Sequence, residues 1–262
     1  MTFYHMSGAG NTFLVADGRN FAQVILEPHE VREIVARNPR LDGSPVEGVL
    51  ILRVRTSNSF DADYYNPDGS YGMMCGNGSR CIVRFAVDRG LDASSEILFT
   101  LNKAPYGAFV NDSDTISVVF PPPRLERTYA SGELDGIDIA IDYVDVGSDH
   151  VVISGPLDAS RPIVRILRNH AEFINGTNVN MTNIQPNGTV NIATFERGVE
   201  DITGACGTGA LSAAVSLWRK ALVSDTVEFT PPSGRRLIVR IEHDGATITN
   251  LILQGDARYD NA

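Results

Sequence analysis

Two stretches of this chain share one pattern: Met74-Cys75-Gly76-Asn77-Gly78-Ser79-Arg80-Cys81 and Ala205-Cys206-Gly207-Thr208-Gly209-Ala210-Leu211. Each reads Cys-Gly-polar-Gly and continues into an apolar stretch with helical spacing. Cys75 and Cys206 lie 131 positions apart, which is half of the 262-residue chain. This spacing predicts a duplicated unit. Two such units folding face to face would bring equivalent thiols to one central cleft.

The residues around both cysteines favour reactive sulfur. Apolar residues recur at three- and four-residue steps over 79–89 and 210–222, which predicts two helices. Each cysteine then lies at or just before a helix N-terminus, where unpaired N–H groups and the helix dipole lower the thiol pKa from about 8.5. The glycines allow a tight turn and a close approach to a ligand. A single cysteine of this kind could be a small buried hydrophobe, but a matched pair favours chemistry.

Three further segments, together with the cysteine motifs, resemble the diaminopimelate epimerase family. They are His5-Met6-Ser7-Gly8-Ala9-Gly10-Asn11-Thr12-Phe13, Asn66-Pro67-Asp68-Gly69-Ser70 and Thr194-Phe195-Glu196-Arg197-Gly198-Val199. The similar segments follow the family's order and span almost the whole chain. The family usually has Asp in place of Thr12. The resemblance implies a cofactor-independent amino-acid epimerase of two similar α/β domains with the site between them.

The resemblance also implies the site residues. Cys75 and Cys206 are the expected catalytic pair, with His150 and Glu196 tuning the thiols or orienting the substrate. The expected substrate-binding residues are Asn11, Asn66, Gly76, Asn77, Asn178, Glu196, Arg197, Gly207 and Thr208. Without the resemblance, His150 reads as a surface residue in a turn, and Glu196 with Arg197 as a solvated ion pair. The asparagines beside glycine or proline read as turn formers.

Epimerisation at Cα removes a weakly acidic proton from one face and adds a proton to the other. Two fixed residues on opposite faces do this more simply than one residue that moves. One cysteine would act as thiolate base and the other as thiol acid, exchanging roles with the handedness of the substrate. The backbone N–H groups around Gly76-Asn77 and Gly207-Thr208 are the natural donors to the α-carboxylate.

Composition excludes several other classes of protein. The net charge of −10 argues against a nucleic-acid or anionic-membrane partner. No basic segment followed by an apolar one begins the chain, no apolar run approaches membrane-spanning length, and three cysteines suit a reducing compartment, so we expect a cytoplasmic protein. The two lysines, Lys103 and Lys220, lie in no segment that suggests a Schiff base. No residue cluster has metal-ligand spacing. We therefore expect no cofactor, no metal and a small-molecule amino-acid substrate, and a homodimer remains open.

Alternating patterns predict helices over 28–37 and 162–169 and strands over 2–5, 13–16, 48–55, 97–109, 115–120, 137–146, 151–153, 188–195, 227–230, 235–242 and 246–254. The expected fold class is α/β (α+β), with two pseudo-symmetric domains, each a curved, mostly antiparallel sheet around a central helix. Pro121-Pro122-Pro123 is the expected linker. The domains are then 1–120, completed by 252–262 according to the resemblance, and 121–251. Cys81 lies within the predicted helix after Cys75 and is expected to pack in the core, with a Cys75–Cys81 redox pair as the less favoured alternative.

Some segments depart from the family pattern and leave alternatives open. The family's Gly-Asn-Pro-His turn is Gly147-Ser148-Asp149-His150 here, and the segment 44–48 is a poor match. These changes affect substrate recognition more than the thiol pair. Another amino-acid racemase of this fold, such as a proline or hydroxyproline epimerase, is the nearest alternative. A relative of phenazine-biosynthesis isomerases would lack the cysteine pair. A thiol redox sensor or an inactive binding protein is the alternative from another class.

Overall fold

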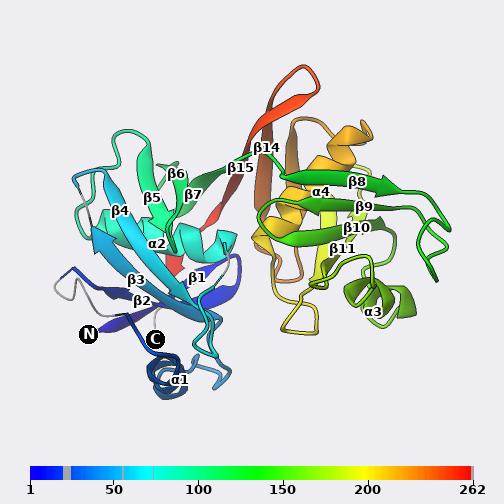
Figure 1. Ribbon diagram of the computed structural model, residues 1–262. Coiled ribbons are helices and arrows are strands. Elements are labelled where there is room, and N and C mark those ends of the chain that lie inside the picture. The colour runs from blue at the N-terminus through cyan, green and yellow to red at the C-terminus, as the bar shows by residue number, and fades with distance from the viewer. Residues whose placement is uncertain (20–24, 55, 73, 261–262) are drawn as a thin grey trace. The chain divides into compact units, whose positions relative to one another are not determined.

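The computed structural model describes residues 1–19, 25–54, 56–72 and 74–260 (Figure 1). The chain divides into two compact units. Unit 1 comprises Met1–Val119 and Gln254–Ala262, and unit 2 comprises Phe120–Leu253. Within these residues, each unit combines one run of neighbouring strands with two helices, so the α/β class expected from the sequence is confirmed.

Unit 1 is built mostly of strands. In chain order its elements are β1 (Phe3–Gly8), β2 (Asn11–Asp17), α1 (Pro28–Arg37), β3 (Gly48–Val54), β4 (Ser59–Tyr65), α2 (Gly76–Asp88), β5 (Ile97–Leu101), β6 (Ala104–Val110), β7 (Thr115–Phe120) and β16 (Arg258–Tyr259). The strands lie in the order β16-β1-β2-β3-β4-β5-β6-β7, followed by β15 (Thr247–Asp256), whose last residues belong to this unit.

Unit 2 follows the same plan. Its elements are β8 (Leu125–Tyr129), β9 (Ile141–Asp145), β10 (Asp149–Ser154), α3 (Pro162–Arg168), β11 (Asn178–Ile184), β12 (Val190–Phe195), α4 (Gly207–Arg219), β13 (Thr226–Thr230), β14 (Leu237–Asp244) and the first part of β15. Its strands lie in the order β15-β14-β13-β12-β11-β10-β9-β8.

The pairing of the strands repeats between the units. In unit 1, β1–β2 is antiparallel, β2–β3 parallel, β3–β4 antiparallel, β4–β5 parallel and β5–β6 antiparallel. In unit 2, the pairs from β9–β10 to β13–β14 follow the same sequence. Parallel neighbours need a long crossover connection, and a helix lies in each of the four crossovers. The duplication predicted from the cysteine motifs is therefore present in the topology.

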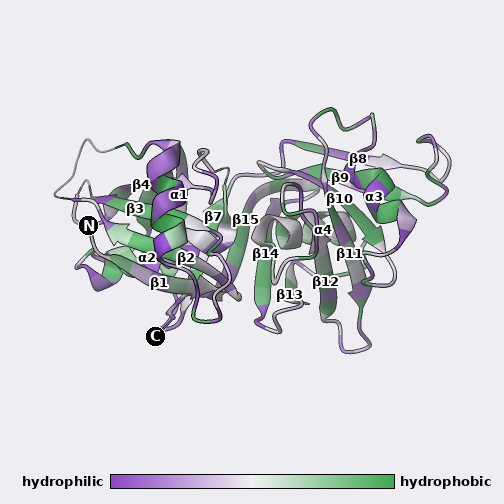
Figure 2. Ribbon diagram, turned by 90° about the horizontal axis from the view of Figure 1, so that it is seen from below, coloured by the Kyte–Doolittle hydropathy of each residue, from purple (hydrophilic) through white to green (hydrophobic). Residues whose placement is uncertain are grey.

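The two helices of each unit cover opposite faces of its sheet. They contact neighbouring residues of the same strands, and neighbouring strand residues point to opposite faces. In unit 1, α1 packs through Val31 and Val35 against Leu14 and Ile51. Residues 76–86 of α2 are all buried, with Gly78 next to Phe13 and Leu50 on the other face. In unit 2, residues 207–217 of α4 are buried in the same way. In Figure 2 the side of α1 that is turned to the viewer is mostly hydrophilic, which suits a helix at the surface.

The structure differs from the sequence prediction at several elements. Both central helices begin three residues earlier than expected, and four strands, β4, β8, β11 and β16, were not predicted. The single strand expected over 97–109 is a hairpin, because Asn102 and Lys103 adopt φ values of 48° and 72° and turn the chain. The predicted strand over 48–55 is β3, and Arg55 lies outside the described residues.

Two further properties concern the described residues. Among them, no helix is long and apolar enough to cross a membrane. Within the same ranges, no three His, Cys, Asp or Glu side chains are grouped so that they could hold a metal ion.

Candidate active site

Cys75 and Cys206 occupy the same local geometry in their units. Each is the N-cap of a central helix, with φ −117° and ψ 107° at Cys75 and φ −117° and ψ 112° at Cys206. The Sγ atom of Cys75 accepts a hydrogen bond from Gly78 N at 3.4 Å, and that of Cys206 accepts one from Gly209 N at 3.4 Å. Sulfur thus takes the place of the usual N-cap oxygen. Neither cysteine is part of a disulfide and both are partly exposed, and the N–H donor and helix dipole favour their thiolate forms.

The glycines after the cysteines lie within the helices, so the tight turn expected from the sequence is wrong. Their role is to leave space. A Cβ atom on Gly209 would lie 2.4 Å from Asn180 Oδ1 and 2.7 Å from Thr194 Oγ1. On Gly78 it would meet the nearest neighbours, two apolar carbon atoms, at 3.4 Å. The close approach in unit 2 is therefore to polar side chains of the sheet.

In unit 1, the first cysteine motif contains a buried arginine in the second turn of α2. Arg80 is fully buried and donates to Asn77 Oδ1 at 2.7 Å and to Gly76 O at 3.2 Å. Its Nε also donates to Asp256 O at 3.2 Å. The Asn77 side chain is therefore held by the helix itself, and its backbone N–H belongs to the first turn, which no intrahelical carbonyl can reach.

Of the other two predicted residues of unit 1, Asn11 begins strand β2 and Asn66 lies in the turn that follows β4. Asn11 is buried and pairs with Gly8 across the β1–β2 hairpin. A Cβ on Gly8 would lie 2.7 Å from Asn77 O, so this hairpin packs closely against the start of α2. Asn66 donates from Nδ2 to Ser70 Oγ at 3.0 Å. Its amide is thus used within a turn, as expected for an asparagine before proline.

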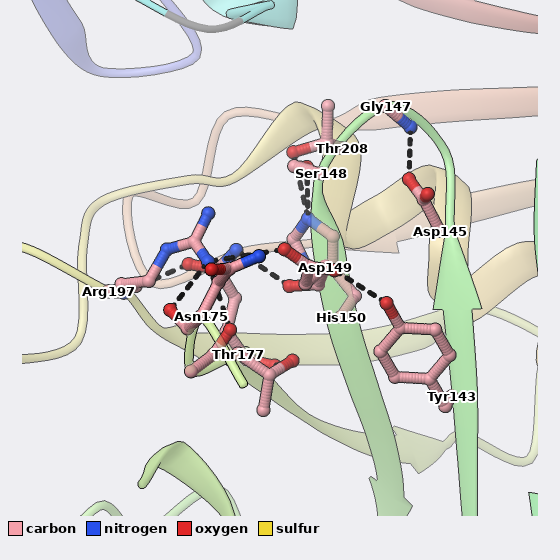
Figure 3. Close-up of polar contacts among 12 residues, drawn as sticks. Tyr143, Asp145, Gly147, Ser148, Asp149, His150, Asn175, Thr177, Arg197 and Thr208 are labelled. Carbon is pink, nitrogen blue, oxygen red and sulfur yellow. Dashed lines mark hydrogen bonds and ion pairs between the residues drawn. The ribbon is translucent and has the colours of Figure 1, made fainter. Parts of the chain in front are cut away.

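His150 lies in strand β10 and is fully buried, so the interpretation as a surface residue is wrong. Its Nε2 is 2.9 Å from Ser148 Oγ and 3.0 Å from Thr208 Oγ1 (Figure 3). Its Nδ1 is 3.1 Å from Asn180 Nδ2. Burial is the largest cause acting on His150 and lowers its pKa to about 3, which outweighs the opposing charge of Asp149. The imidazole is therefore neutral at ordinary pH.

Two groups of unit 2 contact the Cys206 thiol. Thr208 Oγ1 lies 3.6 Å from Cys206 Sγ. The carboxylate of Glu196 is hydrogen-bonded to Cys206 and accepts a hydrogen bond from Thr203. Burial raises the pKa of Glu196, and these two hydrogen bonds oppose that effect. The interpretation of Glu196 as one half of a solvated ion pair is therefore wrong.

Arg197 is held by a set of acceptors around the start of β11. Its guanidinium lies 3.2 Å from Asp149 Oδ2 and donates to the carbonyl oxygens of Asn175 and Gly176 at 2.9 Å each (Figure 3). Its backbone N donates to Asn178 Oδ1 at 2.9 Å, and Asn178 Nδ2 donates to Asp149 O at 2.9 Å. Asn178 thus fixes both the arginine and the strand that carries the aspartate.

Unit 2 brings most of its predicted residues into one hydrogen-bonded network. Cys206 contacts Thr208 and Glu196, and Thr208 contacts His150. The sequence reasoning missed Asn180, Thr194, Thr203, Asp149 and Arg80. The available signal was strand alternation: Asn178, Asn180 and Thr182 are buried polar residues on one face of β11, while Val179 and Met181 on the other face join a hydrophobic core.

Several solved structures have a similar fold. A phenazine biosynthesis protein of the PhzF family from Bacillus anthracis matches with a TM-score of 0.75 and 13% identity, covering 99% of this chain and 96% of that chain. A hydroxyproline epimerase from Agrobacterium vitis matches with a TM-score of 0.70 and 14% identity, covering 99% and 90%. The chain therefore has the duplicated α/β fold that these proteins share.

The sequence itself is more specific. The family model for diaminopimelate epimerase matches residues 3–120 and 143–259. A diaminopimelate epimerase from Chlorobaculum tepidum is 34% identical over 97% of this chain and 96% of the relative. One from Aquifex aeolicus is 30% identical over 93% and 91%. This chain belongs to the diaminopimelate epimerase family and is an enzyme of the isomerase class.

Proposed function

We propose that the protein interconverts LL- and meso-diaminopimelate by proton transfer at Cα, in the biosynthesis of lysine and of cell-wall precursors. One observation carries the proposal: each repeat presents a cysteine as the N-cap of its buried central helix, with the same backbone angles and the same 3.4 Å hydrogen bond to sulfur. Membership of the diaminopimelate epimerase family supports the choice of substrate.

Cys75 and Cys206 act on opposite faces of the substrate carbon in this proposal. The thiolate of one removes the Cα proton and becomes a thiol, and the electron pair of the broken C–H bond is delocalised into the α-carboxylate. The thiol of the other then gives its proton to the opposite face and becomes the thiolate. The two sulfur atoms exchange protonation states in each turnover, so the reverse stereoisomer uses them in the opposite roles.

Charge on the substrate is stabilised by donors that are already in place. The backbone N–H groups of Gly76-Asn77 and Gly207-Thr208 lie at the starts of α2 and α4 and suit the α-carboxylate, whose charge increases during proton removal. Glu196 is a hydrogen-bond partner of Cys206 and can hold the thiol in its resting orientation. Arg197 is the proposed partner of the distal carboxylate. Asn11, Asn66 and Asn178 remain proposed substrate contacts.

Hydrogen–deuterium exchange tests the proposal directly. The reduced protein is incubated in heavy water with LL- or meso-diaminopimelate, and deuterium at Cα is followed by mass spectrometry and NMR. We expect incorporation together with the second stereoisomer. Cys75→Ala and Cys206→Ala should each nearly abolish epimerisation, whereas Cys81→Ala, which changes the remaining cysteine of the chain, buried in α2, should retain it. Substantial epimerisation by either of the first two variants would reject the two-base mechanism.

A second candidate is an epimerase of the same fold that acts on another amino acid. The observation that favours it is Ser148, whose side chain is hydrogen-bonded to His150 at a position where the family pattern has asparagine. The same exchange assay with proline and trans-4-hydroxy-L-proline separates the two candidates. Deuterium exchange with proline or hydroxyproline, and none with diaminopimelate, would favour the second candidate and reject diaminopimelate as the substrate.

A further inference from the structure

Asn180 is a buried polar residue beside the second cysteine motif with no assigned role. It is fully buried in β11, and its side chain lies against the first turn of α4 at Gly209. Its Nδ2 atom is 3.1 Å from Val151 O, and its Oδ1 atom accepts a hydrogen bond from Thr194 Oγ1 at 2.9 Å. A backbone carbonyl can only accept, so the amide orientation is fixed with its NH₂ group toward Val151.

The orientation of Asn180 determines the tautomer of His150. The second N–H of the amide points at His150 Nδ1, 3.1 Å away. Nδ1 must therefore be the unprotonated acceptor, and the single proton of the neutral imidazole lies on Nε2. Asp149 and Arg197 act on this ring with opposite signs, and burial keeps it neutral.

The tautomer of His150 in turn orients Thr208. The Nε2–H group faces Ser148 Oγ at 2.9 Å and Thr208 Oγ1 at 3.0 Å. An N–H group pointing at Thr208 engages a lone pair of that oxygen, so the hydroxyl proton must point elsewhere. Cys206 Sγ, 3.6 Å away, is an acceptor within reach of sulfur hydrogen bonding. At the equivalent place after Cys75 the chain has Asn77, whose Oδ1 accepts a hydrogen bond from Arg80.

We propose that Asn180 is a positioning residue for Cys206: it holds His150 as the neutral Nε2–H tautomer, which turns the Thr208 hydroxyl proton onto the Cys206 sulfur. The hydrogen bond stabilises the Cys206 thiolate, because sulfur accepts it more strongly when charged. Its consequence for turnover rests on the proposed function. The hydrogen-bond chain itself does not, since it is read from contacts within one unit.

The tautomer is measured in the wild-type protein by two-bond ¹H–¹⁵N NMR of the imidazoles, with His150 assigned by its absence in His150→Gln. We expect an unprotonated Nδ1 and a protonated Nε2. A protonated Nδ1 would overturn the proposal. This measurement needs no variant of Asn180, so it decides the first step even if such a variant fails to fold.

The effect on sulfur is measured by iodoacetamide alkylation at pH 7, followed peptide by peptide with mass spectrometry. Thr208→Val should slow alkylation of Cys206 about tenfold, and Asn180→Leu about three- to tenfold. The double variant should be no slower than Thr208→Val alone, because Asn180 acts through Thr208. Additive effects of the two substitutions, or no effect of Asn180→Leu, would reject the proposed hydrogen-bond chain from Asn180 to Cys206.

Controls lie in the same molecule and on the same strand. The alkylation rate of Cys75 should stay unchanged in every variant, and buried Cys81 should stay protected, which separates a local effect from unfolding. Asn183→Leu changes an exposed asparagine of β11 and should leave Cys206 unchanged. If alkylation responds as expected while wild-type protein exchanges no deuterium with diaminopimelate, the hydrogen-bond chain stands and the proposed function fails.

Discussion

Gly209 and Gly78 offer a matched pair of substitutions, because they are the third residues of equivalent helices in the two repeats. Alanine in a helix is favoured over glycine by about 1 kcal/mol. At Gly78 the added methyl group meets its nearest neighbours at 3.4 Å, which is ordinary contact. We therefore expect Gly78→Ala to keep wild-type stability or gain up to about 1 kcal/mol.

Gly209→Ala should behave in the opposite way. The new methyl group would lie 2.4 Å from Asn180 Oδ1 and 2.7 Å from Thr194 Oγ1, and both side chains are buried. Overpacking of this kind costs about 1–3 kcal/mol. Separating the two polar atoms leaves them unsatisfied at a cost of about 1–3 kcal/mol. After the helix gain, we expect unit 2 to lose about 3 kcal/mol of unfolding free energy.

Urea unfolding measures this difference. Trp218 is the one tryptophan of the chain and lies in α4, so its fluorescence reports the unfolding of unit 2. Circular dichroism follows the whole chain and reports Gly78→Ala. A Gly209→Ala protein as stable as wild type would refute the reasoning. It would mean that Asn180 and Thr194 leave room for a methyl group at Gly209.

The remaining predictions concern single polar side chains of unit 2. Arg197→Lys should raise the KM for diaminopimelate about tenfold, since lysine cannot bind a carboxylate bidentately; an unchanged KM in steady-state kinetics would reject the contact. Because burial lowers the pKa of His150 to about 3, its contribution to stability is complete above pH 6.5 and is lost as the pH falls toward 3, by up to about 1.4 kcal/mol per pH unit. Urea unfolding of His150→Gln at pH 7 and pH 5 should show a shallower loss than wild type, and equal slopes would contradict the burial. The pKa of Glu196 is raised, so the stability linked to its protonated form is present below pH 4.5 and lost as the pH rises. The urea midpoint of unfolding of Glu196→Gln should therefore exceed that of the wild type at pH 8 but not at pH 4. A lower midpoint at pH 8 would contradict the raised pKa of Glu196.

Local patterns predicted those features of the fold that depend on neighbouring residues. The apolar spacing of 28–37 predicted α1 with its observed bounds. The repeated Cys-Gly-polar-Gly segments predicted two helices with a cysteine at or just before each start, although both helices begin three residues earlier than expected. The 131-residue offset predicted a duplicated α/β fold, which the matching order of parallel and antiparallel pairs confirms. These features are local because helix periodicity and N-capping act over a few residues.

The sequence by itself thus determined the repeat, the fold class and the place of both thiols at helix starts. Only the tertiary structure decided which polar residues surround them. His150 follows a turn, and Asn180 lies in a strand that the sequence did not reveal. Parallel pairing of β10 with β11 places His150 opposite Asn178 and Asn180 opposite Val152. This register brings His150 and Asn180 within hydrogen-bonding distance of each other. Burial and tautomer depend on this register and on the packing of α4 above it. Such contacts join residues far apart in the chain, and no local pattern encodes them.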